Sequence, residues 1–267
     1  MSETPPDPAA ALAALRAEID TLDESLHGLL VRRAEVVQRL ASSAAKPAGT
    51  TLRPGREARI LRRLLAAHHG PMPRATLVQL WREIFAGSVA QQSAFSVVLP
   101  NDPALARIAA AHFGVATPLR LHPSPGRALS ALMGREASAA VLPWPRESDT
   151  EEEAWWWHFD APHLQVIARL PFFHQGEPPL EAAVVALYPT DPTEHDAALL
   201  RIELPGTHDR SALATRCPGG RIIMLRRDGT RTRALVETEA LPPGAPLPEG
   251  AALLGRYAIP ERGAPAA

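Results

Sequence analysis

Six polar residues in the first 95 positions stand where helical apolar patterns would otherwise continue. Two arginines fall on one predicted helix, an arginine and a glutamate begin a second, and a serine and a glutamine lie four residues apart on a third. In sequence order they are Arg16, Arg33, Arg56, Glu57, Ser88 and Gln92. Buried charge of this density is costly unless it meets counter-charge, so one interpretation is a site between helices for a small polyanion. The alternative is that Arg33, Arg56 and Glu57 pair with one another on a solvated face.

Three predicted helices must position these side chains. Apolar residues spaced by three and four positions indicate a helix from about Pro8 to Ala45. At 1.5 Å per residue this helix would be roughly 55 Å long, so it needs a partner along most of its length. Pro47 breaks it, because proline biases the preceding residue away from helix. Two further helices are expected over residues 54–69 and 73–94.

From residue 95 the pattern changes to strands that alternate with helices. Strands over 95–99, 119–121 and 139–143 alternate with helices over 102–113 and 126–133, which is typical of a small parallel α/β layer. Further strand-like runs lie at 164–170, 182–188, 199–204, 220–225 and 232–237. The proline-rich residues 241–248 are expected to cover the surface.

The composition excludes several classes of function. The 267 residues carry 28 Lys+Arg and 29 Asp+Glu, a net charge of −1, so no chain-wide attraction to nucleic acid or to an anionic membrane is expected. The charge is uneven, because residues 9–95 hold 11 Arg and 1 Lys against 7 acidic residues, whereas residues 101–267 hold 16 Arg against 20. An anionic ligand should therefore prefer the first third. The sequence has neither a bilayer-length apolar run nor a secretion signal, and we expect a cytoplasmic protein.

Other conspicuous residues favour structural roles. Cys217 is the single cysteine, so it can form neither an internal disulfide nor a multi-thiolate metal site. Trp155–Trp157 is more typical of packing than of a ligand cage, and His68-His69 of a helix end than of a metal site. The basic run 221–233 has too few aromatic residues to indicate nucleic-acid binding and predicts a solvated hairpin.

Four motifs within residues 9–95 resemble, in order and spacing, those of the all-helical chorismate mutase family. They are Leu15-Arg16-Ala17-Glu18-Ile19-Asp20, Leu29-Leu30-Val31-Arg32-Arg33, Arg53-Pro54-Gly55-Arg56-Glu57 and Ser88-Val89-Ala90-Gln91-Gln92. The resemblance implies an N-terminal all-α, three-helix chain that forms an intertwined homodimer, with the long first helices crossing between protomers. It also implies conversion of chorismate to prephenate in aromatic amino-acid biosynthesis, with no metal and no cofactor.

By this resemblance the six polar residues would bind chorismate. Arg33 of one protomer and Arg16 of the other would bind the two substrate carboxylates, as the guanidinium fork does well. Glu57 would hold the substrate hydroxyl, Arg56 and Ser88 would help to position a carboxylate, and Gln92 would donate to the ether oxygen. Seventeen residues separate Arg16 from Arg33, so in a helix they point roughly 100° apart and are compatible with serving different sites.

The family's lysine, a second donor to the ether oxygen, is absent at the family spacing. That spacing leads from Arg33 to Ala44, whereas Lys46, the only lysine, lies two residues further on. In an ideal helix Lys46 is roughly 140° from the face of Arg33, so it can serve only if the helix end unwinds before Pro47. As the sole lysine, Lys46 is the donor we expect. Arg53 also replaces the family's usual acid, and both departures are compatible with lowered activity.

Residues 95–173 are similar to the start of prephenate dehydratase domains. The resemblance is carried by His112-Phe113-Gly114, Ser138-Ala139-Ala140-Val141-Leu142-Pro143 and Val166-Ile167-Ala168-Arg169-Leu170. That family needs a Thr-Arg-Phe motif far along the domain. No Phe follows Phe173 here, and the triplet taken as nearest, Thr215-Arg216-Cys217, lacks the aromatic residue. We therefore expect a degenerate, prephenate-dehydratase-like α/β domain that has lost this catalysis.

The predicted organisation follows from these patterns. We expect a disordered leader at 1–8, a chorismate mutase helical domain at 9–95, an α/β domain at 96–260 and a tail at 261–267. The expected partners are chorismate and a second copy of the chain, with neither nucleic acid nor membrane. Two alternatives stay open: a bifunctional mutase and dehydratase, and a non-catalytic sensor of an aromatic metabolite built on a mutase-like dimer.

Overall fold

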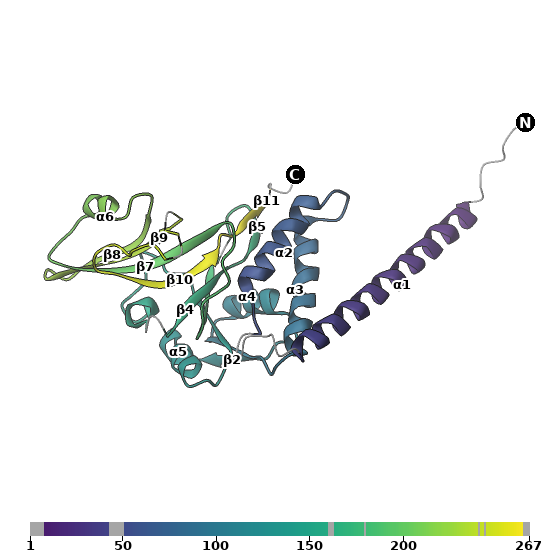
Figure 1. Cartoon of the computed structure of the whole chain (residues 1–267), viewed down its shortest axis with the longest axis horizontal. Coiled ribbons are helices and arrows are strands. Elements are labelled where there is room, and N and C mark those ends of the chain that lie inside the picture. The colour runs from purple at the N-terminus through teal and green to yellow at the C-terminus, as the bar shows by residue number, and fades with distance from the viewer. Residues whose placement is uncertain are drawn as a thin grey trace, which may run out of the picture. The chain divides into compact units, whose positions relative to one another are not determined.

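The computed structural model describes residues 8–42, 51–159, 163–178, 180–239, 241–242 and 244–263. The chain divides into two compact units, Met1–Gly49 and Thr50–Ala267 (Figure 1). The second unit contains two of the three N-terminal helices as well as the α/β region. In the described part of the chain, no helix combines the length and apolar character that a membrane span requires.

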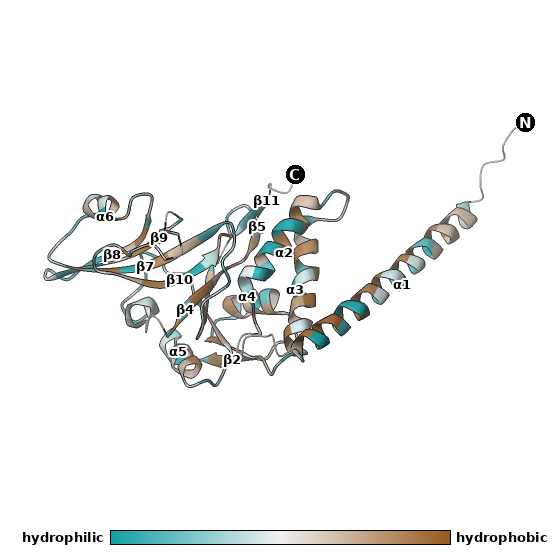
Figure 2. Ribbon diagram, in the orientation of Figure 1, coloured by the Kyte–Doolittle hydropathy of each residue, from teal (hydrophilic) through white to brown (hydrophobic). Residues whose placement is uncertain are grey.

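The first unit is a single long helix, α1 (Pro8–Ala41). This confirms the helix expected from the apolar spacing over the described residues; positions 43–45 and Lys46 lie outside them. Apolar and polar residues alternate along its whole length (Figure 2). None of the described residues of α1 is buried, and ten of its large apolar side chains, from Leu12 to Leu40, are 39–64% exposed. The helix α1 therefore presents a long, exposed apolar stripe that its own residues do not cover.

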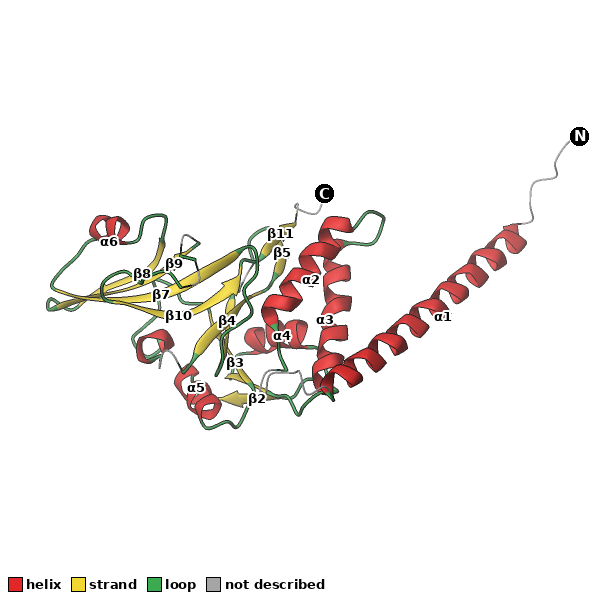
Figure 3. Ribbon diagram, viewed as in Figure 1, coloured by secondary structure: helices red, strands yellow, loops and turns green. Residues whose placement is uncertain are grey.

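Helices α2 (Pro54–Ala67) and α3 (Arg74–Ala90) lie side by side in the second unit (Figure 3). Both expected helices are thus confirmed, with slightly earlier ends. Pro54 occupies the first turn of α2, where its missing N–H costs nothing, and the Nε2 of His68 at the end of α2 lies 2.7 Å from the Met72 carbonyl oxygen. The apolar faces of α2 and α3 share one core with Phe172 and Ala258 of the α/β region.

Nine strands of the described residues form one mixed sheet, in the order β2-β1-β3-β6-β4-β10-β7-β9-β8. In chain order the strands are β1 (Val97–Pro100), β2 (Leu119–His122), β3 (Ala139–Pro143), β4 (Gln165–Leu170), β6 (Ala182–Ala186), β7 (Asp196–Pro205), β8 (Arg221–Arg227), β9 (Arg231–Thr238) and β10 (Ala251–Ala258). Strand β1 pairs in parallel with β2 and β3, which confirms the expected parallel α/β layer. The other neighbours pair antiparallel, apart from the parallel contact between β4 and β10.

Helices cover both faces of the first half of the sheet. Because side chains alternate along a strand, Val98 packs on the side of α5 (Pro125–Met133), whereas Val97 and Leu99 pack on the side of α4 (Pro103–Phe113). The short 3₁₀ helix η1 (Trp155–His158) places Trp155 and Trp156 in the same core as α5. The packing role expected for the tryptophans is confirmed.

The second half of the sheet contains both confirmed and missed elements. Strands β8 and β9 form the hairpin expected for the basic run, and Cys217 is buried beside α6 (Arg210–Arg216). Three features were not expected from the sequence: α6, β10 and the two-stranded pair of β5 (Phe173–Gln175) with β11 (Glu261–Gly263). Strand β10 was missed because Gly255 interrupts its apolar run; this residue has φ +154° and meets the backbone of Val166 closely.

The start of α2 is fixed against the loop after β6. Arg53 donates two hydrogen bonds to the Asp191 carboxylate, at 2.5 and 2.6 Å, and the Gly55 N–H donates to the Thr190 hydroxyl at 3.0 Å. A Cβ on Gly55 would lie 1.9 Å from the Asp191 carbonyl oxygen. Glycine is therefore required here by close backbone approach.

We expect Gly55→Ala to lower the free energy of unfolding by about 1–3 kcal/mol, because the added methyl group must push the helix off this loop. The matched control is Gly87→Ala in α3, where a Cβ would meet nothing within 4 Å. That change should stabilise the helix by about 0.5–1 kcal/mol. Urea unfolding of the full chain measures both, and a Gly55→Ala variant as stable as wild type would contradict the close contact.

Candidate functional site

The two arginines predicted to bind carboxylates, Arg16 and Arg33, both lie on α1. They belong to the first compact unit, whereas the other described candidates belong to the second. Their separation along the helix is as expected, so they point roughly 100° apart around its axis. Lys46, the predicted donor to the ether oxygen, lies outside the described residues.

Ser88 lies on α3, and Gln92 lies in the turn two residues after α3 ends, where its side chain still reaches back to Ser88. The Gln92 side-chain amide donates to the Ser88 carbonyl oxygen at 2.7 Å, and the Ser88 hydroxyl donates to the Ile84 carbonyl oxygen at 2.7 Å. Both side chains are half-buried, as are Trp81 and Ile84 further back along the same stripe. The stripe of Trp81, Ile84, Ser88 and Gln92 is thus a partly covered surface that borders the core.

Glu57 is buried and has an arginine partner that the sequence analysis did not single out. The Arg82 Nη1 donates to the Glu57 Oε2 at 2.8 Å, and the side chains are only 5% and 10% exposed respectively. Burial raises the pKa of Glu57, and Arg82 opposes the shift only in part. The alternative pairing of Glu57 with Arg56 is wrong, since Arg56 is exposed and the ion pair is formed with Arg82.

A signal for Arg82 is present in the sequence. Arg82 lies four residues after Val78 and three before Phe85, and Val89 follows four residues after Phe85. These positions form one helical stripe of buried apolar residues that a single cation interrupts. Burying that cation requires a nearby acid, and Glu57 at the start of the preceding helix meets the requirement. The same reasoning that selected the other polar residues would have selected Arg82.

Glu57 borders a cavity of about 350 Å³ within the second unit. The walls are mostly apolar and come from α3, α4 and the segments next to them, including Leu52, Phe85, Val89, Phe95 and Phe113. The polar wall residues are Glu57, Glu83, Ser93, His112 and Thr117; Arg56, Ser88 and Gln92 are not among the lining residues. Such a cavity suits an apolar ring whose hydroxyl reaches a carboxylate.

His112 contributes a neutral ring to this cavity. Burial lowers the pKa of His112 well below its ordinary value, and the charge of Arg82 lowers it further. Its Nε2 has no hydrogen-bond partner among the described residues, while its ring packs edge-on against Phe113 at 4.6 Å between centroids. The sequence analysis named this residue only as part of a motif of the α/β region.

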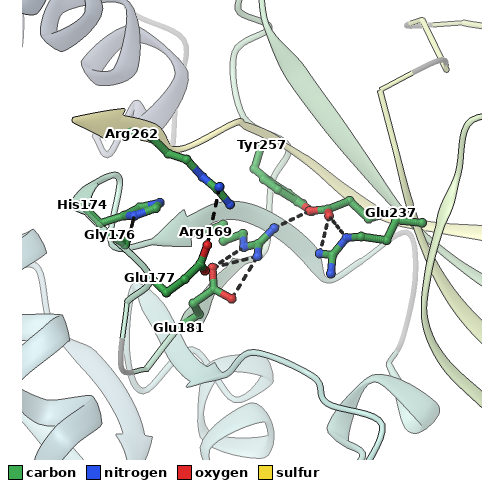
Figure 4. A network of polar contacts seen from close by, with 9 residues as sticks. Arg169, His174, Gly176, Glu177, Glu181, Glu237, Tyr257 and Arg262 are labelled. Carbon is green, nitrogen blue, oxygen red and sulfur yellow. Dashed lines mark hydrogen bonds and ion pairs between the residues drawn. The ribbon is translucent and has the colours of Figure 1, made fainter. Parts of the chain in front are cut away.

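A second polar centre lies in the α/β region, around Arg169 on β4 (Figure 4). Arg169 contacts the Glu181 carboxylate at 2.7 Å and the Glu237 carboxylate at 2.7 Å, and its guanidinium stacks on Trp144 at 4.5 Å. The Tyr257 hydroxyl also donates to Glu237. Arg169, Glu181 and Glu237 border a cavity of about 470 Å³. The sequence triplet Thr215-Arg216-Cys217 is not among the lining residues of that cavity and lies at the end of α6.

Glu237 is the hub of this centre, because its carboxylate contacts Arg169, Arg221 and Tyr257. Burial would raise its pKa, but Arg169, the Tyr257 hydroxyl and Arg221 outweigh burial and hold the pKa of Glu237 below its ordinary value. Burial and the Glu237 charge raise the pKa of Tyr257 well above its ordinary value, so its phenol stays protonated. Each carboxylate around Arg169 is therefore an acceptor already used within the protein.

Comparison with known proteins assigns the N-terminal region. Residues 15–93 match the model of the family "Chorismate mutase type II". This stretch is a type II chorismate mutase domain. Its described part comprises most of α1, all of α2 and α3, and the six polar residues Arg16, Arg33, Arg56, Glu57, Ser88 and Gln92.

The curated relatives are longer than the region they share with this chain. "Bifunctional chorismate mutase/prephenate dehydratase" of Neisseria gonorrhoeae is 29% identical over 138 residues, which cover 51% of this chain and 37% of that protein. The protein of the same name from Pseudomonas aeruginosa is 31% identical over 118 residues, which cover 40% and 32%. The matched stretch thus spans about a third of the length of these relatives.

The α/β region resembles prephenate dehydratase only distantly in structure. The X-ray structure of prephenate dehydratase from Streptococcus mutans aligns with 63% of this chain and 99% of that chain, at 12% identity and a TM-score of 0.43. A likeness at this level carries no argument about activity.

The hub role of Glu237 predicts a pH-dependent loss of stability in Glu237→Gln. A lowered folded-state pKa contributes stability above the unfolded value of 4.5, and this contribution is lost as the pH falls through the folded pKa. We expect Glu237→Gln to cost about 1.5–3 kcal/mol at pH 7, because charged hydrogen bonds are removed from a buried group. The cost should shrink below pH 4.5.

The control is Glu203→Gln, which removes another acid with two arginine partners, Arg231 and Arg233, at 2.9 and 3.1 Å. Glu203 is 40% exposed, so water screens these pairs and the change should cost less. Urea unfolding at several pH values compares the variants. Equal costs for both substitutions at pH 7 would contradict the central place of Glu237.

Proposed function

We propose that this protein is a chorismate mutase, which converts chorismate to prephenate by an intramolecular Claisen rearrangement in aromatic amino-acid biosynthesis. The observation that carries the proposal is the type II chorismate mutase domain at residues 15–93, with the polar set in family order. An enzyme of this pathway acts in the cytoplasm, where we expect the chain.

The chemistry suits the residues. The rearrangement has no covalent enzyme intermediate, so the protein must hold a dicarboxylate in a compact form and stabilise negative charge on the ether oxygen. Arg33 and the second protomer's copy of Arg16 bind the two carboxylates. Glu57 accepts the substrate hydroxyl, and Gln92 and Lys46 donate to the ether oxygen. Arg56 and Ser88 help to position a carboxylate.

The site is formed by a homodimer in this proposal. The exposed apolar stripe of α1 supports it, because ten large apolar side chains at 39–64% exposure need a cover. A second copy of α1 fits the requirement in length and character, in the manner of paired long helices. The roughly 100° between Arg16 and Arg33 allows one α1 to serve two sites.

The test is the loss of chorismate absorbance with purified full-length protein, with prephenate identified as the product and the oligomer mass recorded. Turnover by a dimer is the expected result. Absence of turnover, with chorismate still raising the thermal stability, would favour the sensor alternative, which the unusual position of Lys46 motivates.

Arg33→Ala should lower kcat/KM by a factor of about 30 to 1000, because it removes a charged fork worth about 2–4 kcal/mol from a closed site. Circular dichroism should be unchanged, since Arg33 lies on a helix without buried residues. Retained activity would contradict the role of Arg33. An unchanged rate in Lys46→Ala would mean that Gln92 or another donor serves the ether oxygen alone.

A mixing experiment tests whether the site is shared between protomers. Arg16→Ala and Arg33→Ala homodimers should each be nearly inactive, because every site lacks one arginine. After subunit exchange, half of the dimers contain one chain of each kind, and each of these has one intact site and one doubly altered site. Activity should rise to about a quarter of the wild-type value. No recovery despite confirmed exchange would exclude a shared site.

We further propose that the α/β region lacks prephenate dehydratase activity. Gly255-Arg256-Tyr257 on β10 keeps an arginine and an aromatic residue of the Thr-Arg-Phe motif, with glycine in place of threonine. A Cβ at Gly255 would lie 2.1 Å from the Val166 carbonyl oxygen, so threonine does not fit. The names of the relatives favour the bifunctional alternative, and phenylpyruvate formation from prephenate above background would establish it.

A further inference from the structure

Arg82 contacts the carboxylate of Glu57 from outside the cavity that Glu57 borders. Glu57 is among the lining residues, whereas Arg82 is not. The 2.8 Å contact uses one carboxylate oxygen, Oε2. Arg82 is 4% exposed, so the ion pair lies in the interior and is shielded from solvent. A ligand in the cavity would therefore meet Glu57 without touching Arg82.

The α/β region holds the other side of Arg82. The Arg82 guanidinium lies 5.5 Å from the ring centroid of Phe172, which is two residues beyond the end of β4. This distance is within cation–π range, and Phe172 is itself buried in the core shared by α2 and α3. The position of Arg82 is thus fixed by a mutase helix on one side and by the α/β region on the other.

Among the described groups around Glu57, Arg82 is the one that favours the charged form of its carboxylate. Arg82 is the one cation among the described groups that act on Glu57. His112 on α4 is neutral because burial lowers its pKa, and Tyr188 is neutral because burial and Glu57 raise its pKa to about 12. Glu83, which lines the same cavity, is a second acid. Without Arg82, burial would raise the pKa of Glu57 further.

We propose that Arg82 is a positioning residue of the mutase site, which favours the charged form of the Glu57 carboxylate and holds it toward the cavity, and that the α/β region supports the site through Phe172. The inference rests on the proposed function, because it uses the role of Glu57 toward the substrate hydroxyl. It gives the α/β region a part in the mutase reaction that does not require a catalytic activity of its own.

The test is the pH profile of kcat/KM for chorismate in full-length Arg82→Met and Arg82→Lys. Arg82→Met should lose about 10- to 100-fold at pH 7, as expected when a substrate-binding group is misplaced or wrongly protonated. Its activity should recover as the pH rises, because Glu57 then loses its proton. Arg82→Lys keeps the cation and should retain a profile close to that of wild type. An unshifted acid limb in Arg82→Met would overturn the proposal.

Two controls separate positioning from general destabilisation. Arg62→Met removes a second arginine that lies over Phe172, at 5.9 Å, and is bound to Glu261 rather than to Glu57; it should lower stability and leave the pH profile unchanged. Glu57→Gln with Arg82→Met should be no less active than Glu57→Gln alone, because Arg82 acts through Glu57. Additive losses would overturn the proposal.

A readout without turnover distinguishes the failure of this inference from failure of the proposed function. Carbon-13 NMR of carboxyl-labelled glutamate, with the Glu57→Gln spectrum for assignment, gives the pKa of Glu57 directly. The pKa should rise in Arg82→Met and stay near the wild-type value in Arg62→Met. If wild type does not convert chorismate, the proposed function fails. An unchanged Glu57 pKa in folded Arg82→Met, or in Arg82→Gln if the methionine variant does not fold, overturns the role of Arg82.

Discussion

The close approach of the first turn of α2 to the backbone at Asp191 is the constraint on which the second unit depends. Only glycine fits at position 55, since a Cβ would lie 1.9 Å from a carbonyl oxygen. Arg53 fixes the same turn through two short hydrogen bonds to the Asp191 side chain. Because α2 is fixed at its start, α3 and the core around Phe172 are joined to the α/β region as one compact unit.

The packing of α2 and α3 against the α/β region explains why charge is buried where they meet. Glu57 lies on α2 and Arg82 on α3, and both side chains are almost fully covered. A buried ion pair is weak evidence for stability, since desolvation offsets much of the attraction. The role proposed for Glu57 toward a ligand in the cavity that it borders would account for the presence of this pair. In contrast, α1 keeps its apolar stripe exposed.

Much of the fold was predictable because local pattern and final environment agree. The three mutase helices, the parallel strands β1 to β3 and the hairpin β8–β9 each follow the period expected for their type. Strand β10 was not predicted, because its pairing with β4 requires a glycine that weakens the strand pattern. The Ser88–Gln92 spacing indicated that these two side chains lie near each other, and Gln92 does bond back to Ser88, whereas Arg82 was overlooked although it interrupts a buried apolar stripe in the same way as the selected residues.

The sequence by itself determined the helices, the order of the motifs and the mutase assignment of residues 15–93, because spacing along a helix decides which residues share a face. Only the tertiary structure decided the partner of Glu57. Contacts between residues far apart in the chain depend on how elements pack, and the choice of Arg82 over the adjacent Arg56 follows from which of the two the α/β region buries. Arg56, the cation nearest to Glu57 in sequence, is therefore exposed to solvent, and the more distant Arg82 is the ion-pair partner.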